Sequence, residues 1–128
     1  MKLQPDRSDD VNLIQSFGED GVRVQNQLWT GSLLVPARGP VLPWPVPTLH
    51  DLQEEHFAAI AAMQCELVIF GSGERLRFPP PALLQPLMRQ RIGLETMDTR
   101  AACRTFNILA GEGRNVVAAL IGANTTGG

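Results

Sequence analysis

The chain has 128 residues, of which 44% are hydrophobic and 19% are charged, and this composition is typical of one globular domain. The formal net charge is −2 and the basic residues form no continuous block, which argues against a nucleic acid or an anionic membrane held by bulk charge. No stretch reaches the roughly 18 consecutive apolar residues of a transmembrane helix, so we expect no direct membrane insertion.

The two ends of the chain are polar. Residues 1–10 lack the apolar core and the cleavage site of a signal peptide, and they do not resemble a transit peptide. We therefore predict a disordered tail over 1–10, a single domain over 11–122 and a second disordered tail over 123–128. Cys65 and Cys103 both lie in apolar contexts, which favours buried, reduced thiols over a disulfide or a metal site. These features predict a cytoplasmic protein, and the shortness of the chain suggests a bacterial one.

The first half of the domain is predicted to form strands. Partial alternation over 11–17 and 22–24, on either side of a glycine-bounded turn at 18–21, predicts a β-hairpin. A third strand is expected over 28–35. The proline-rich stretch 40–47 can only be an edge strand or an extended loop, because proline has no amide proton for a ladder. A proline-rich peptide ligand would have the same composition, but the apolar side chains of this stretch, Trp44 among them, favour packing on the domain.

The second half alternates between helix and strand signals. A Thr48 cap and helically spaced apolar residues predict a helix from 48 to about 63, and the apolar run 66–70 predicts a strand buried on both faces. A helix over 82–90 should be kinked or cut short by Pro86. Its predicted inner stripe consists of Leu83, Leu84, Leu87 and Met88.

The last three elements are a strand near 93–96, a helix from Asp98 or Thr99 to about 110, and a strand over 115–121. We therefore predict an α/β fold with a mixed sheet, in which an N-terminal β-hairpin region is followed by α-β-α-β-α-β.

Two short motifs stand where an open α/β sheet places its ligands. Gly71-Ser72-Gly73 follows a predicted strand, but it lacks the third glycine of a dinucleotide fingerprint and the Lys-Ser/Thr of a phosphate loop. A close-packed glycine turn is the simpler interpretation. Asp98-Thr99-Arg100 stands at a strand-to-helix junction, where Asp98 can cap the helix, act as a base or orient Arg100 for an anion.

The predicted helix after Asp98 carries further candidates. Arg100 and Arg104 lie one turn apart, so they can grip a carboxylate or phosphate together or pair with acidic neighbours. Cys103 lies on a small-residue helix face with Ala101 and Ala102, which favours packing over a nucleophilic role, although the adjacent Arg104 would lower the pKa of an exposed thiol. Asn107 is a poor residue for a helix interior and must bond a neighbouring loop or face solvent. At the end of this helix, Glu112 and Arg114 flank a glycine and suggest an ion pair that fixes the turn, or a contact with a partner.

The order of these residue types resembles a known family. The resemblance extends from about Ile14 to Ile121 and is strongest at 71–73 and 97–114. It rests on the run Leu94-Glu95-Thr96-Met97-Asp98-Thr99-Arg100-Ala101-Ala102-Cys103-Arg104-Thr105-Phe106-Asn107, on Glu112-Gly113-Arg114 and on the apolar run 116–121. These segments resemble a family of small domains of unassigned activity that includes the mitochondrial complex I alpha-subcomplex assembly factor. The resemblance implies a compact α/β domain without an established cofactor and, for its mitochondrial members, a part in building the peripheral arm of NADH:ubiquinone oxidoreductase.

Two functional hypotheses follow. The first is a non-enzymatic interaction or assembly factor that needs no cofactor or metal and binds a protein, such as a respiratory complex subunit or another assembly factor. Its predicted surface contains Trp44, Arg100, Arg104 and Arg114. The alternative is a small-ligand-binding protein or enzyme, with a pocket between Gly71-Ser72-Gly73 and Asp98-Thr99-Arg100.

Overall fold

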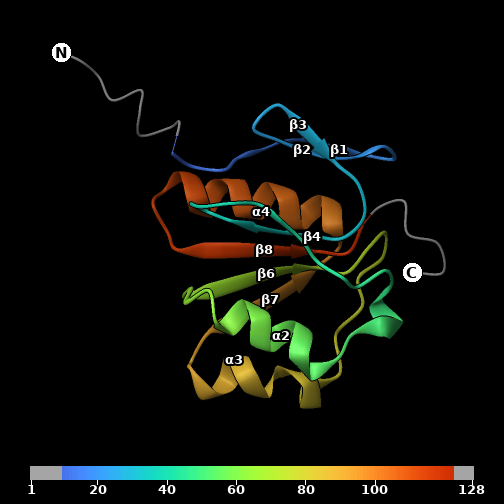
Figure 1. The fold of residues 1–128 in the computed structure, drawn as a ribbon, viewed down its shortest axis with the longest axis vertical. Coiled ribbons are helices and arrows are strands. Elements are labelled where there is room, and N and C mark those ends of the chain that lie inside the picture. Colours follow the sequence, from blue (N-terminus) through green and yellow to red (C-terminus); the bar gives the residue numbers. More distant parts are fainter. Residues whose placement is uncertain (1–9, 123–128) are drawn as a thin grey trace.

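The computed structural model describes residues 10–122. A five-stranded mixed sheet forms the centre of the domain, and helix α4 (Thr99–Gly111) covers one of its faces. Helices α2 (Glu54–Ala61) and α3 (Gln85–Arg89) cover the other face, and a separate three-stranded sheet lies on the far side of α4 (Figure 1). This arrangement confirms the predicted α/β domain with a mixed sheet.

The small sheet contains the predicted hairpin. Strands β1 (Ile14–Gly18) and β2 (Gly21–Val24) pair antiparallel, and β3 (Gln27–Trp29) adds to β2 after a turn in which Gln25 and Asn26 both have positive φ. The single strand predicted over 28–35 is wrong. The chain breaks at Gly31, whose φ is +78°, and the second part of this segment joins the central sheet as β4 (Leu33–Pro36).

The central sheet has the order β5-β4-β8-β6-β7. Strands β6 (Leu67–Gly71), β7 (Gly93–Met97) and β8 (Val116–Leu120) are parallel, whereas β4 and the short edge strand β5 (Leu42–Pro43) are antiparallel to their neighbours. The chain moves outward from β6 to β7 and then back past β6 to β8. Because crossovers between parallel strands are right-handed, the reversal of direction places α3 and α4 on opposite faces.

The predicted helix over 48–63 is wrong in its first part. A single turn of 3-10 helix, η1 (Leu49–Asp51), ends at Leu52, and α2 begins only at Glu54 because Leu52 and Gln53 are both extended. The predicted interruption at Pro86 is confirmed, since η2 (Pro81–Leu84) ends before α3 starts with Pro86 in its first turn. Met88 is exposed and does not belong to the inner stripe, whereas Leu87 is buried.

The apolar core consists of two layers, one on each face of the central sheet. On β6, Val68 and Phe70 point towards α2 and α3, and Ile69 points towards α4. The residues of β8 alternate in the same way, as expected for strands buried on both faces. Within residues 10–122, no helix has the length and apolar character needed to span a membrane.

Candidate functional site

The two candidate motifs meet at the carboxyl ends of β6 and β7. The turn Gly71-Ser72-Gly73 follows β6, and Asp98 follows β7 as the N-cap of α4. The Asp98 carboxylate accepts a hydrogen bond from the Ala101 N–H at 2.8 Å. This bond satisfies one of the free donors in the first helical turn and confirms the predicted cap.

Thr99 closes the space between these strand ends. Its side chain is fully buried, and its hydroxyl accepts from the Gly73 N–H at 2.9 Å and donates to the Ile121 C=O at 3.0 Å. Gly71 packs so tightly here that an added Cβ would lie 2.9 Å from the Thr99 Cα. The Gly73 amide, which a phosphate cradle would need, is thus already occupied by a protein hydroxyl.

Ser72 is also turned inward. Its side chain is 1% exposed, and its hydroxyl lies 2.6 Å from the Arg75 C=O and accepts from the Arg77 N–H at 3.0 Å. A second carbonyl, that of Met97, lies 3.2 Å from the same hydroxyl. Ser72 therefore fixes the segment after the turn against the end of β7, and its hydroxyl does not face solvent.

A hollow of about 430 Å³ lies beside the two motifs. It brings together Gly73, Asp98 and Arg100 from the predicted set, while Gly71, Ser72 and Thr99 do not line it. The rest of its lining is Phe17, Gly18, Glu19 and Glu74. Sequence reasoning missed these residues because the β1–β2 turn lies about 80 positions before α4 and reaches it only through the tertiary fold.

The charged side chains that line this hollow favour a ligand with a positively charged group, because carboxylates outnumber cations. Three carboxylates, those of Glu19, Glu74 and Asp98, share the lining with the single cation Arg100. The Arg100 guanidinium lies 5.1 Å from the centre of the Phe17 ring, a cation–π contact that orients the side chain.

The other polar candidates on α4 have different surroundings. Arg104 is exposed one turn after Arg100. Asn107 accepts from the Ile14 N–H at 2.7 Å through its Oδ1 and donates to the Ile14 C=O at 2.9 Å through its Nδ2. Asn107 therefore makes an internal bond, as the first alternative predicted, but its partner is the start of strand β1 and not a loop, so it joins α4 to the small sheet.

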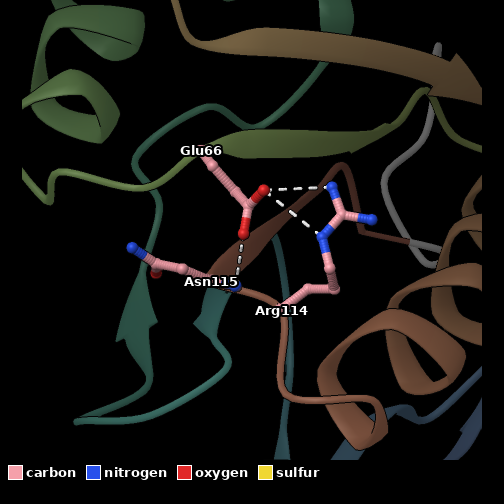
Figure 2. A network of polar contacts seen from close by, with 3 residues as sticks. All are labelled: Glu66, Arg114 and Asn115. Carbon is pink, nitrogen blue, oxygen red and sulfur yellow. Dashed lines mark hydrogen bonds and ion pairs between the residues drawn. The ribbon is translucent and has the colours of Figure 1, made fainter.

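Arg114 and Asn115, which precede β8, bind Glu66, which precedes β6, and so join the first ends of these two strands (Figure 2). The Nη2 and Nε of Arg114 lie 3.0 and 3.3 Å from the same carboxylate oxygen of Glu66, and the second oxygen of Glu66 accepts from the Asn115 N–H at 3.0 Å. The predicted ion pair with Glu112 is therefore wrong, since the partner of Arg114 comes from the start of β6. The hydrogen bond from Arg114, followed by that from Asn115, lowers the pKa of the Glu66 carboxyl.

Trp44 lies in the core. It is 3% exposed, its ring makes edge contacts with Phe57 and Phe70, and its indole N–H donates to the His56 C=O at 3.4 Å. The prediction that the proline-rich stretch packs on the domain is confirmed. Because Trp44 is buried, the interaction surface proposed below does not include it.

Cys103 is unsuited to nucleophilic chemistry. Burial raises the pKa of its thiol to about 12, although the nearby charges of Arg100 and Arg104 act in the opposite direction. Both cysteines are free and buried, as predicted. The described part of the chain contains no group of three His, Cys, Asp or Glu side chains placed to hold a metal ion.

Comparison with known proteins shows that this chain is similar to one family of proteins. The family model described as "Protein of unknown function (DUF498/DUF598)" matches residues 14–121. NADH dehydrogenase [ubiquinone] 1 alpha subcomplex assembly factor 3 from Bos taurus is 34% identical over 111 residues, which are 84% of this chain and 59% of that protein. The chain thus spans about three fifths of the length of the curated relatives that it matches.

Solved structures show the same fold. A Bordetella parapertussis protein has a TM-score of 0.82 at 33% identity, covering 88% of this chain and 96% of that one. A Bartonella henselae protein described as an outer membrane protein has a TM-score of 0.76 at 29% identity, with the same coverage of 88% and 96%. Because the family model matches residues 14–121, a range that includes nearly all of the domain, this chain belongs to the DUF498/DUF598 family of proteins of unknown function.

Proposed function

We propose that this protein is a non-enzymatic protein-binding domain that acts in the assembly of a respiratory NADH dehydrogenase complex. The main support for this proposal is that the polar groups at the strand ends already form hydrogen bonds within the protein, so they are not presented to a substrate. Thr99 binds the Gly73 amide and the Ile121 carbonyl, Ser72 binds the backbone of 75–77, and Asp98 caps α4. The sequence similarity to NADH dehydrogenase [ubiquinone] 1 alpha subcomplex assembly factor 3 supports NADH dehydrogenase subunits as the class of partner.

The surface that we assign to this function is the exposed first half of α4. Arg100 and Arg104 lie on it one turn apart, next to the hollow lined by Phe17 and three carboxylates. Neither arginine forms an ion pair with another described residue, so both guanidinium groups can bind carboxylates of a partner.

Capture from the native host tests the proposal. The tagged protein is purified from mildly solubilised cells, and bound proteins are quantified by mass spectrometry. We expect enrichment of NADH dehydrogenase subunits and its loss in an Arg100→Ala, Arg104→Ala double variant. A double variant with the same charge change at two exposed positions, Arg23→Ala and Arg38→Ala, should capture as wild type does. No enrichment of these subunits with the wild-type protein would reject the proposal.

The hollow supports one alternative, the binding of a small ligand. Its volume of about 430 Å³ and its mixed charges suit a small molecule with an amine and a carboxylate. A thermal-shift screen of amino acids tests this alternative, with amines that lack a carboxylate as controls. Stabilisation by an amino acid that disappears on Arg100→Ala would favour it over protein binding.

A further inference from the structure

The segment between β6 and η2 carries two exposed large apolar side chains two positions apart. Leu76 is 55% exposed and Phe78 is 68% exposed, and they alternate with Arg75 and Arg77. Single exposed apolar residues are common on protein surfaces, but an exposed leucine and an exposed phenylalanine on one short segment provide two anchor side chains for a binding partner.

The segment is held in place. The buried Ser72 hydroxyl bonds to the Arg75 C=O and the Arg77 N–H, which fixes the backbone on both sides of Leu76. Immediately after Phe78, Pro79 is buried, and it opens a run of three prolines that restricts the backbone further. A side chain presented by a fixed backbone loses little conformational freedom on binding, so its apolar area contributes more fully to affinity.

Between Glu74 and Glu95, the charged side chains are all of one sign. From 75 to 94 the chain contains four arginines and no Asp or Glu, although the whole chain has a net charge of −2. Of these arginines, only Arg89 forms an ion pair among the described residues, with Glu54 at 3.6 Å. Arg75 and Arg77 are therefore available to carboxylates outside the chain.

We infer that Arg75-Leu76-Arg77-Phe78 is a docking segment that inserts Leu76 and Phe78 into an apolar groove of a partner protein, while Arg75 and Arg77 pair with Asp and Glu residues at the rim of that groove. Aromatic and arginine side chains are the residues that most often dominate protein interfaces, and complementary charge sets the register of docking. Ser72 is the positioning residue of the segment. This inference rests on the proposed protein-binding function but uses a surface separate from Arg100 and Arg104.

Site-specific photo-crosslinking in the native host tests the inference. A benzophenone amino acid replaces Phe78 in the protein, and the matched control carries it at Leu42, which is 40% exposed on the edge strand β5, away from Arg100 and Arg104. We expect position 78 to give a protein adduct that position 42 does not give. The crosslinked peptide should lie in an apolar groove with acidic residues at its border. Adducts only to lipid, or the same adducts from both positions, would overturn the inference.

Two further variants test separately how much the arginine charges and the Ser72 hydrogen bonds contribute to the yield of the adduct. Arg75→Glu with Arg77→Glu should reduce the adduct roughly tenfold or more, because both charge pairs become repulsive. Ser72→Ala should reduce it less, and a matched thermal unfolding curve will show that the domain is folded. Binding of the purified wild-type protein to phosphatidylcholine–phosphatidylglycerol vesicles, lost in the double Glu variant, would assign the segment to a membrane and refute the protein groove.

These outcomes are distinguishable from failure of the proposed function. If NADH dehydrogenase subunits are captured but position 78 yields no protein adduct, the docking segment is rejected and the assembly role stands. If capture enriches no NADH dehydrogenase subunits but position 78 crosslinks to an acidic groove of another protein, the docking segment stands and the assembly role is rejected.

Discussion

Replacing Thr99 by valine tests whether the polar groups at the strand ends serve structure. Valine keeps the shape of threonine but removes the hydroxyl that bridges the Gly73 N–H and the Ile121 C=O. Leaving a buried donor or acceptor unsatisfied costs about 1–3 kcal/mol. Two partners lose their bond, so the free energy of unfolding should fall by about 2–6 kcal/mol.

The matched control is Thr99→Ser, which keeps the hydroxyl and removes only a buried methyl group. Its expected cost is about 1 kcal/mol. Because 1 kcal/mol corresponds to roughly 4 °C in Tm for a domain of this length, the valine variant should melt roughly 8–24 °C below wild type and the serine variant about 4 °C below. Fluorescence of the buried Trp44 reports the transition in urea or on heating. A valine variant as stable as the serine variant would refute the bridging role.

Three other perturbations have defined outcomes. Asn107→Ala removes both bonds to Ile14 and should lower the free energy of unfolding by about 2 kcal/mol while speeding hydrogen exchange of the Ile14 amide; unchanged exchange would show that the bonds do not join α4 to β1. Glu66→Gln should destabilise the domain at neutral pH. Because the folded-state pKa of Glu66 is lowered by Arg114, the wild-type advantage is complete well above pH 4.5 and is lost as the pH falls through the folded pKa; an advantage that grows on acidification would contradict this. Cys103 should label with a thiol-specific disulfide reagent at pH 8 only after unfolding, because burial raises its pKa to about 12, and rapid labelling of the native protein would refute its burial.

The second half of the fold could be predicted from sequence because its elements carry strong local signals. The uninterrupted apolar runs 67–70 and 116–121 are short and each ends at a glycine, which favours buried strands over helices, and α4 combines an Asp98 cap with a helical apolar stripe. The start of α2 could not be located in the same way. His56 Nδ1 accepts the Gln53 N–H at 2.9 Å, so a histidine fills the role that glutamate usually plays in a capping box, and the break before α2 has no familiar signature.

The candidate site could be predicted only in part, because its residues depend on partners far away in the chain. Arg114 pairs with Glu66, 48 positions earlier, and not with its neighbour Glu112. Ser72 and Thr99 were recognised as polar residues at strand ends, but the sequence alone does not show that their hydroxyls point into the protein. The exposure of Leu76 and Phe78 likewise depends on the fold, although the alternation with arginines and the absence of acidic residues over 75–94 were readable signals.

The most direct test of the assembly role is the amount of mature NADH dehydrogenase in a host strain that lacks this protein. Membranes of the deletion strain, of wild type and of the complemented strain are compared on native gels stained for NADH dehydrogenase activity, with subunit transcripts measured in parallel. We predict that the assembled complex decreases in the deletion strain at unchanged transcript levels and returns on complementation. An unchanged amount of assembled, active complex in the deletion strain would contradict the proposed function.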